Sequence, residues 1–296
     1  MPEKRPRHES VLLKEALEGL AVRPGGLYVD GTVGLAGHSK AILKHSTPGG
    51  FLVGLEWNKD SFELAQKELR PFEGRFLLVR ENFSKIKEVL EELGKTPVDG
   101  ILLDLGLSSF LLEGSGKGFS FLRDEPLDMR MDDRLSRTAK DLVNQLTPLQ
   151  LEELIRAYGE ERYARRITRA ICEARCKEPL RTTRQLAEII YQAVPPKYRH
   201  GKIHPATRTF QALRIAVNQE LENLKRFLDS APEVLRPGGR VVIISFHSLE
   251  DRLVKRAFRE DSRLQVLTKK PVTPTEEEIL KNPRARSARL RIAERV

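Results

Sequence analysis

The feature that most constrains the fold is a set of short apolar segments near the start of the chain, each ending in polar or glycine residues. These segments span residues 27–31, 51–56, 75–80 and 98–105. Between them, apolar residues recur at spacings of three and four, as in Phe62, Ala65 and Leu69, which predicts helices over 37–44, 60–70 and 84–93. Strands that alternate with helices indicate a parallel α/β sheet.

This alternation stops after the fourth segment. Residues 111–133 are rich in Gly, Ser and charge without a clear period, and 138–193 show only a helical pattern. After Pro205 we expect one further helix to about Leu235, then a turn at Arg236–Gly239 and a buried strand over 240–246. The pattern predicts an α/β sheet interrupted by an all-helical insert. The sheet domain is expected to comprise residues 1–110 and 215–296, and the insert residues 111–214.

Positive charge is concentrated in the predicted insert. The 296 residues carry a net charge of +10, and residues 134–214 hold 17 Lys and Arg against 8 Asp and Glu. Such a surface suits an RNA phosphate backbone, although a solvated helix surface would have the same composition. No apolar run is long enough for a membrane span, and the charged start has no apolar signal segment, so we expect a cytoplasmic protein without membrane contact.

The loop after the first predicted strand, Asp30–Ser39, has glycines at 31, 34 and 37. Glycines there allow a ligand to approach the backbone, and the helix that follows favours an anionic group. The spacing differs from dinucleotide and phosphate-loop motifs, whereas Glu56, after the second strand, suits two ribose hydroxyls. A ligand with a ribose, an ammonium, a carboxylate and no phosphate is S-adenosylmethionine (SAM). A purely structural glycine-rich turn is the alternative.

The fourth predicted strand ends in Asp104-Leu-Gly-Leu-Ser108-Ser109. Ligands of open α/β sheets bind at the carboxyl ends of the strands. We therefore expect Asp104, Ser108 and Ser109 at the sulfonium end of the cofactor, facing the substrate. The alternative is an Asp that caps the next turn.

Several strings, in order along nearly the whole chain, resemble the RsmH (MraW) family of bacterial small-subunit rRNA cytosine-N4 methyltransferases. The strings that carry this resemblance are residues 8–13, 30–39, 99–109, 118–121, 126–132, 158–162, 204–214, 245–251 and 282–287. The resemblance implies a class I SAM-dependent methyltransferase (Rossmann-like) sheet with an inserted helical domain. It also implies a SAM cofactor and 16S rRNA, or the small ribosomal subunit, as partner.

The resemblance also implies where the cofactor binds, with Phe83 against the adenine. The implied cofactor contacts are Gly34, Ala36, Gly37, His38, Glu56, Phe83, Asp104 and Leu111. The chain departs from the family at three of these positions: Ala36 stands for Gly, Glu56 for Asp and Leu111 for a Gln that normally adds a polar contact. For Phe83, an ordinary core position is the alternative.

The methyl acceptor implied by the family is an exocyclic cytosine amine in the decoding region. Methylation at cytosine C5 instead normally needs a Cys nucleophile, but Cys172 and Cys176 lie one helical turn apart in the insert. Two such cysteines fit neither a disulfide scaffold nor a metal site, so we expect no metal. Asp104, Ser108 and Ser109 are the candidate catalytic residues, because they could accept hydrogen bonds and the released proton.

Basic residues of the insert are the candidate RNA contacts, with the target base unstacked from its neighbours. They are Arg162, Arg165, Arg166, Arg169, His204, Arg208 and Arg214. For His204, as for His247 after the last buried strand, a hydrogen-bonded structural role is the alternative.

Three other functions stay open at this point. They are methylation of another RNA exocyclic amine, a ribosome-assembly factor that binds SAM without catalysis, and a nicotinamide oxidoreductase. The glycine spacing and Asp30 count against the oxidoreductase. The nucleotide, the proton acceptor, the choice between free rRNA and an assembled subunit, and the oligomeric state also stay open.

Overall fold

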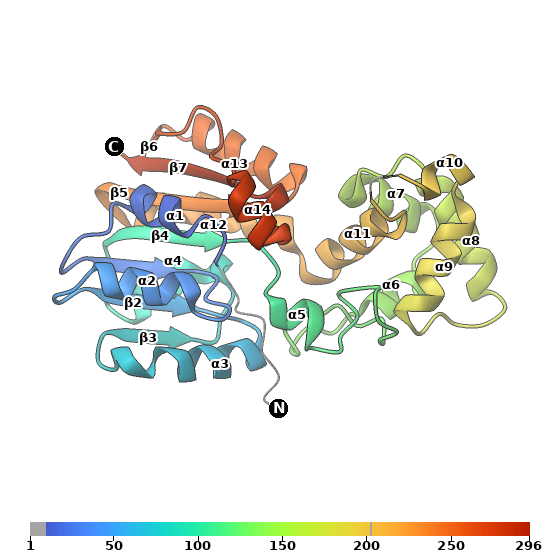
Figure 1. Ribbon diagram of the computed structural model, residues 1–296, viewed down its shortest axis with the longest axis horizontal. Coiled ribbons are helices and arrows are strands. Elements are labelled where there is room, and N and C mark those ends of the chain that lie inside the picture. The colour runs from blue at the N-terminus through green and yellow to red at the C-terminus, as the bar shows by residue number, and fades with distance from the viewer. Residues whose placement is uncertain (1–9, 202) are drawn as a thin grey trace. The chain divides into compact units, whose positions relative to one another are not determined.

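The computed structural model of the protein describes residues 10–201 and 203–296, without the side chains of Ser109 and Glu113; His8, in the first family-like string, lies outside them. The chain forms two compact units (Figure 1). The sheet unit contains the described residues up to Gly106 together with Leu221–Val296, and the helical unit is Leu107–Glu220. The sequence placed these transitions at 110/111 and 214/215.

Within the described residues, the sheet unit holds one seven-stranded sheet in the order β3-β2-β1-β4-β5-β7-β6. The strands are β1 (Leu27–Asp30), β2 (Phe51–Leu55), β3 (Phe76–Val79), β4 (Val98–Asp104), β5 (Leu235–Ser245), β6 (Leu264–Val266) and β7 (Arg289–Arg295). The first five strands pair in parallel, while β7 runs antiparallel to both β5 and β6. The predicted α/β fold with a helical insert is confirmed.

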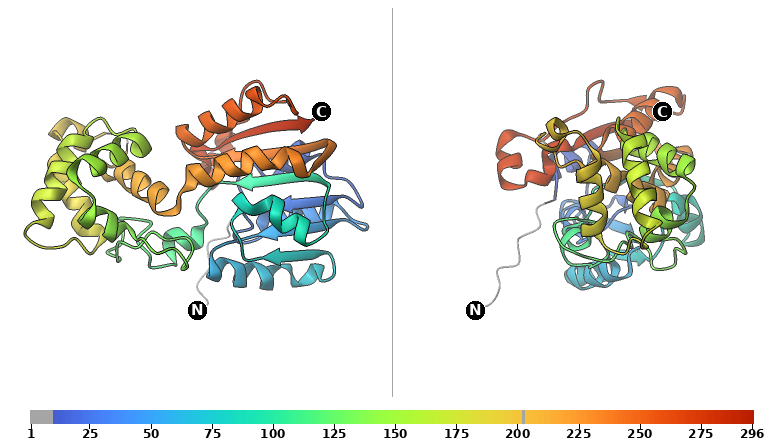
Figure 2. Two further views of the ribbon diagram at one scale, coloured as in Figure 1. Left: turned by 180° about the vertical axis from the view of Figure 1, so that it is seen from behind. Right: turned by 90° about the vertical axis from the view of Figure 1, so that its right-hand side faces the viewer.

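Helices cover both faces of the sheet, because alternate strand residues point to opposite sides. Tyr28, Leu52 and Leu102 pack with α1 (Leu13–Leu20), α2 (Gly37–His45) and α3 (Lys59–Leu69), the blue and cyan helices in front in Figure 1. The neighbouring strand residues Val29 and Ile101 belong to the core of the other face. That face is covered by α4 (Ile86–Glu92), α12 (Glu220–Val234) and α13 (Ser248–Glu260), which Figure 2 shows from behind.

The helical unit has its own apolar core, built from residues such as Leu151, Ile155, Ile167, Ile190 and Leu213. Its helices are α5 (Ser109–Glu113), α6 (Ala139–Gln145), α7 (Pro148–Gly159), α8 (Ala164–Arg175), α9 (Thr183–Ala193), α10 (Pro196–Arg199) and α11 (Ala206–Asn218). Each fully buried aliphatic side chain stabilises such a core by about 2 kcal/mol.

The single helix predicted after Pro205 is wrong, because α11 ends at Asn218 and α12 begins at Glu220. Between them Gln219 adopts a left-handed conformation with φ 50°. Asn218 donates a hydrogen bond to the Met129 carbonyl (2.8 Å) and accepts one from the Met131 amide (2.8 Å). Residues 206–231 contain no Gly or Pro. The local sequence therefore does not indicate the break, which depends on contacts with a distant loop.

Three further details of the sheet unit differ from the prediction or were not predicted. Residues Arg236–Gly239, predicted as a turn, lie inside β5, where its pairing with β4 shifts register. The sequence also did not predict α1, β6, β7 or α13, or the short elements. The short elements are α14 (Glu276–Lys281), η1 (Arg70–Phe72), η2 (Phe83–Lys85) and η3 (Pro283–Ser287). In the part of the chain that the structure describes, no helix is long and apolar enough to cross a bilayer.

Candidate functional site

The candidate cofactor site lies in the sheet unit, where β1 has β2 on one side and β4 on the other (Figure 1). Asp30 ends β1, Glu56 follows β2 directly, and Asp104 ends β4. Chain connections leave β1 and β4 toward opposite faces, which opens a crevice at the carboxyl ends of such strands. Three of the acidic residues singled out from the sequence therefore lie at one edge of the sheet.

The glycine-rich loop after β1 adopts an unusual backbone conformation. Gly34 has φ 53°, and Ala36 has φ 62° although it is not glycine. A left-handed conformation costs a residue with a Cβ about 1–2 kcal/mol. Ala36 precedes the first turn of α2, and among the described residues no side chain caps that turn. Its free amide groups can therefore receive an anionic ligand group.

The loop is also covered by the start of the described chain. A Cβ on Gly37 would lie 2.0 Å from Ser10 Oγ, so the absence of a side chain lets Ser10 approach. The carbonyl of Val11 lies 3.1 Å from Nε2 of His38. This packing was not predicted from the sequence, and the only available signal was that the first family-like string includes these positions.

Glu56 connects the loop to the end of β2. One carboxylate oxygen accepts a hydrogen bond from the Gly34 amide (2.9 Å), and the other accepts one from the Asn58 amide (2.8 Å). The residue is buried, and burial raises the pKa of its carboxyl to about 7. Each oxygen has a second lone pair, so the ionised group could still accept hydrogen bonds from two ribose hydroxyls.

Asp30 is engaged within the loop itself. Its carboxylate accepts hydrogen bonds from the Ser39 hydroxyl (2.5 Å) and the Thr32 amide (3.1 Å), and the residue is only 1% exposed. Burial raises the pKa of Asp30, while the hydrogen bond from Ser39 opposes that rise. Asp30 therefore organises the loop, and the acceptors that remain for a ligand ammonium are on His38 and Asp104.

His38 faces Asp104 with an unprotonated nitrogen. A carbonyl oxygen can only accept, so the bond to Val11 assigns the proton of a neutral imidazole to Nε2. Burial lowers the pKa of His38, which keeps the ring neutral near pH 7. Its Nδ1 then presents a lone pair 3.7 Å from a carboxylate oxygen of Asp104. Two acceptors that face each other at this distance suit a ligand that donates N–H groups.

Asp104 is held in place while part of its side chain remains exposed. Its amide donates to the Thr32 hydroxyl (2.7 Å), and its carboxylate accepts from the Gly106 amide (3.0 Å). A Cβ on Gly106 would lie 2.8 Å from the Phe246 ring and 3.0 Å from Asp104, so this glycine allows a close approach. The side chain of Asp104 is 22% exposed, in contrast to buried Asp30. This contrast favours Asp104 as the residue that contacts ligand and substrate.

Phe83 lies between the loop and the core. It packs edge-on against Phe227 with ring centroids 5.9 Å apart, and it is 8% exposed. A Cβ on Gly31 would lie 3.2 Å from the Cβ of Phe83, so the base of the Phe83 side chain is close to the start of the loop. These contacts fit both a core position and one wall of an adenine site, and the adenine contact stays a prediction.

The remaining catalytic and cofactor candidates belong to the helical unit. Ser108 caps α5, because its hydroxyl accepts a hydrogen bond from the Leu111 amide (3.2 Å). Ser109 begins α5, and its side chain lies outside the described part of the structure. Leu111 is buried in the core of the helical unit, so the apolar residue at this family Gln position has a packing role.

The predicted RNA contacts differ in how firmly the structure holds them. Arg165 and Arg166 are exposed on α8, while Arg169 approaches Glu173 on the same helix at 3.6 Å. Arg162 precedes α8, and its guanidinium lies 4.8 Å from the ring centroids of both Tyr163 and Tyr198.

Arg208 and Arg214 are engaged within the helical unit. Arg208 donates to the Glu160 carbonyl (2.8 Å). Arg214 makes two hydrogen bonds of 2.7 Å to Glu220, and its side chain is 17% exposed. The geometry therefore favours Arg165 and Arg166 as phosphate contacts over Arg214.

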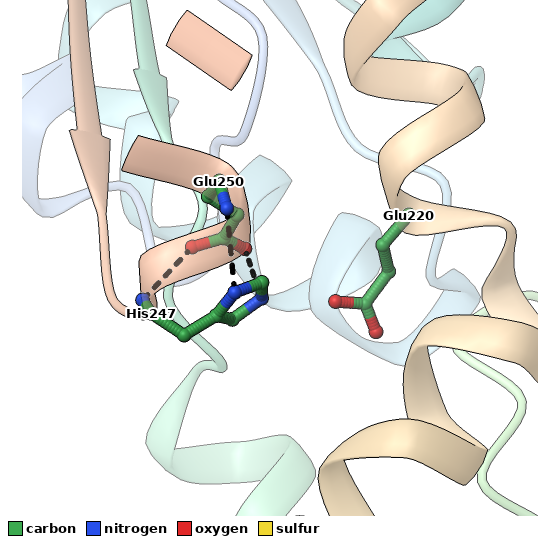
Figure 3. A group of neighbouring side chains, drawn as sticks. All are labelled: Glu220, His247 and Glu250. Atoms are coloured by element: carbon green, nitrogen blue, oxygen red, sulfur yellow. Dashed lines mark hydrogen bonds and ion pairs between the residues drawn. The ribbon is translucent and has the colours of Figure 1, made fainter. Parts of the chain in front are cut away.

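The two histidines have different surroundings. His204 stacks on Phe121 with centroids 4.6 Å apart and planes 29° apart. His247 caps α13: its Nδ1 accepts from the Glu250 amide (3.4 Å), and the Glu250 carboxylate accepts from the His247 amide (3.3 Å) (Figure 3). Such reciprocal bonds satisfy the first amides of a helix. This geometry gives His247 the structural role that was its alternative.

The chain is similar to known proteins along its whole length. The profile of the MraW methylase family matches residues 5–296. The chain is 51% identical over 289 residues to ribosomal RNA small subunit methyltransferase H of Desulfotalea psychrophila, covering 98% of each chain. It is 50% identical to the protein of that name from Syntrophus aciditrophicus, over 100% of each chain. A crystal structure of a candidate rRNA methylase from Clostridium thermocellum shares the fold at TM-score 0.50 and 11% identity, covering 98% of this chain and 100% of that one.

Proposed function

The chain belongs to the MraW methylase family, and from this premise we propose that it transfers a methyl group from SAM to the exocyclic N4 of a cytosine in small-subunit rRNA. The fold is that of a class I, Rossmann-like, SAM-dependent methyltransferase with an inserted helical unit. The finer part of the proposal is the target: a cytosine amine in the decoding region of 16S rRNA. An enzyme that acts on bacterial rRNA works in the cytoplasm.

The observation that carries the proposal is the set of hydrogen-bond acceptors at the carboxyl edge of β1, β2 and β4. Glu56 retains acceptor capacity for two ribose hydroxyls, and His38 and Asp104 present acceptors to an ammonium group. The uncapped first turn of α2 provides amides for a carboxylate. These residues fit the ribose, the ammonium and the carboxylate of SAM, and they include no Lys or Arg that would pair with a pyrophosphate.

When bound, SAM supplies a methyl group on a positively charged sulfur, and a nucleophile placed in line with the carbon–sulfur bond can accept that methyl group. The protein's task is therefore mainly to position the acceptor. An exocyclic cytosine amine is a weak nucleophile, because its lone pair is shared with the ring. A carboxylate or hydroxyl that accepts a hydrogen bond from its N–H group makes the nitrogen more nucleophilic, and the carboxylate can take the released proton.

Asp104, Ser108 and Ser109 are proposed for this role. Asp104 is the partly exposed acid of the cofactor site, and the chain continues from it through Gly106 to Ser108 at the start of α5. The contrasting C5 chemistry would need a cysteine thiolate. Both cysteines of the sequence, Cys172 and Cys176, lie at α8 in the helical unit. This placement favours an amine acceptor over a ring carbon.

The helical unit is proposed to bind rRNA. Its basic excess, with exposed Arg165 and Arg166 on α8, suits phosphate groups. Because an amine within a paired and stacked base is difficult to reach, the target cytosine is expected to be unstacked on binding.

The experiment is methyl transfer from tritiated SAM to 16S rRNA and to small ribosomal subunits from cells that lack this protein. Nucleosides from the product are then identified by mass spectrometry. The proposal expects label in N4-methylcytidine at one position of the decoding region. Label in 5-methylcytidine or on an adenine or guanine amine would contradict the target, and SAM binding without transfer would instead support a non-catalytic assembly factor.

A further inference from the structure

The helical unit contains a stack of flat side chains that the methyltransferase chemistry does not use. Phe121 stacks on His204 with centroids 4.6 Å apart, and His204 is nearly parallel to Tyr191 at 6.0 Å and 21°. On Tyr191 lies the guanidinium of Arg199, 5.1 Å from the ring centroid. Residues from a loop, from α9 and from α10 thus form one continuous stack.

A second cluster involves the neighbouring residue of α10. Tyr163 and Tyr198 pack edge to face, with centroids 4.9 Å apart and planes at 68°, and the Arg162 guanidinium lies 4.8 Å from each centroid. Tyr198 and Arg199 are consecutive residues of α10, so this helix contributes to both the stack and the cluster. We call the combined set the aromatic strip. It comprises Phe121, Arg162, Tyr163, Tyr191, Tyr198, Arg199 and His204.

The strip includes an apolar surface that a folded monomer would normally bury. His204 is exposed, and its chain neighbour Ile203 is 51% exposed. Leu122, next to Phe121, is 86% exposed. Phe121, Tyr163 and Tyr198 pack partly against the core of the helical unit. The exposed apolar side chains beside them extend this core to the solvent, as at a binding surface.

The Tyr198 hydroxyl donates to Glu161 (2.8 Å), but other polar atoms of the strip remain able to bind a ligand. Among the described residues, the Tyr191 hydroxyl and His204 Nε2 have no hydrogen-bond partner, whereas His204 Nδ1 accepts from the Ala206 amide (3.2 Å). Partial burial lowers the pKa of His204, which keeps the ring neutral. Arg199 is held flat by bonds to the carbonyls of Val194 (3.2 Å) and Gln192 (3.0 Å), which leaves its Nη1 available to a phosphate.

We propose that the aromatic strip binds unpaired RNA nucleotides by stacking, as a second contact surface beside the phosphate-binding arginines of α8. Aromatic rings and guanidinium groups close together in a unit of positive charge match single-stranded RNA, whose bases stack on flat side chains while its phosphates bind cations. A protein partner would match the apolar side chains but would not require the flat geometry. The inference rests on the proposed function for its choice of RNA as ligand.

The test measures RNA binding by the full-length protein without methyl transfer. A short unstructured oligoribonucleotide carries one 2-aminopurine, whose fluorescence falls when the base stacks. Tyr191→Leu removes a ring, and Tyr191→Phe keeps it. His204→Leu removes a second ring at an exposed position, so that the result does not depend on Tyr191 alone. Leu149→Ala, at a 67% exposed apolar side chain of α7, is the matched control. Circular dichroism checks that each variant is folded.

We expect Tyr191→Leu and His204→Leu to weaken binding by about 5- to 150-fold, the range for loss of one stacked base, and to abolish the quenching. Tyr191→Phe should retain the quenching, and the salt dependence should not change, since no charge is removed. Unchanged affinity and quenching in both leucine variants, or equal binding of duplex RNA, would overturn the proposal.

Two further outcomes separate this proposal from others. Variants that keep their RNA affinity but no longer bind the assembled small subunit would assign the strip to a ribosomal protein, and the proposal would be wrong. A protein that transfers no methyl group, yet loses quenching in the leucine variants, would contradict the proposed function and support the strip.

Discussion

In the sheet unit the acidic candidate residues lie at strand ends, where Asp30 and Glu56 are buried, whereas in the helical unit the arginines that the geometry favours are exposed on a helix. Glu56 and Asp30 are 8% and 1% exposed, and each carboxylate accepts hydrogen bonds from the loop that it supports. Arg165 and Arg166, by contrast, are exposed on α8. One site is fixed by hydrogen bonds, and the other is a surface of charge and aromatic rings.

This difference predicts which perturbation each site responds to. Buried acids in a low dielectric respond to pH and to the loss of single atoms, because each proton or hydrogen bond there has a large energetic effect. Exposed arginines respond to salt, because their attraction to phosphates is screened and arises largely from counterion release. The five predictions below test this contrast.

The largest effect is expected at Asp104. Asp104→Ala removes the only partly exposed carboxylate among the three acids of the site, and with it the proposed proton acceptor. Methyl transfer should fall by about 10²- to 10⁴-fold, the usual contribution of a positioned acid or base. Single-turnover transfer of tritiated methyl to small subunits measures the effect.

Asp104→Asn is the matched variant for this prediction. An amide oxygen can still accept from Gly106 (3.0 Å in the native protein), so the turn should form and the melting temperature should change little. Because the charge is lost, activity should remain low. Full activity in Asp104→Asn would remove this carboxylate from the chemistry and would weaken the contrast between the two units.

The next effect concerns pH and Glu56. Burial raises the pKa of this carboxyl to about 7, and only the ionised form can accept from two ribose hydroxyls while it holds the loop. The affinity for S-adenosylhomocysteine should therefore fall by about tenfold for each pH unit below 7. Calorimetry in buffers of different ionisation enthalpy should detect proton release on binding. A Glu56→Gln variant that keeps the same pH dependence would contradict the assignment.

The same shift has a consequence for stability. A carboxyl whose pKa is raised on folding stabilises the folded state fully below its unfolded pKa, and this contribution is lost as the pH rises through about 7. The difference between 4.5 and about 7 corresponds to about 3 kcal/mol. Urea unfolding from about pH 5 to about pH 8 should show a smaller loss of stability in Glu56→Gln than in the native protein.

A smaller effect is expected from the arginines of the helical unit. Replacing both Arg165 and Arg166 with Ala should lower the slope of log affinity against log salt for single-stranded RNA by about 1.4, since each phosphate contact contributes about 0.7. Arg156→Ala is the control, because Arg156 is exposed on α7 but pairs with Glu152. Fluorescence anisotropy over a salt series measures the slope. An unchanged slope would mean that Arg165 and Arg166 do not contact RNA phosphates and are only solvated surface charges.

The sheet unit could largely be predicted from its sequence because its signals are local. The strands at 27–31, 51–56, 75–80 and 98–105 were predicted to within a residue or so of β1 to β4. These strands are nearly continuous apolar runs because both faces of the sheet are buried. The orientation of the Asp30 side chain was harder to predict from the sequence. Its hydrogen bonds with Ser39 and Thr32 direct it into the loop rather than toward a ligand.

The helical unit was predicted less completely, because its features depend on contacts between distant segments. The arginines are visible in the sequence, but nothing near Phe121 indicates that it stacks on His204. The break at Gln219 likewise depends on Asn218 and its bonds to Met129 and Met131, from a loop far away in sequence. Local periodicity contains no information about either contact.

The smallest effect is expected at Ala36, where this chain departs from the family's usual glycine. Ala36→Gly relieves a left-handed conformation that costs about 1–2 kcal/mol, but it adds unfolded-state entropy and removes a fully buried methyl group, each opposing the gain by roughly 0.5–1 kcal/mol. The free energy of unfolding should therefore change by less than about 1 kcal/mol, and the affinity for S-adenosylhomocysteine by less than about twofold. Urea unfolding and calorimetry measure both. A much larger loss of affinity would mean that the methyl group itself helps to shape the loop, so that the fixed geometry of the sheet unit depends on packing as much as on hydrogen bonds.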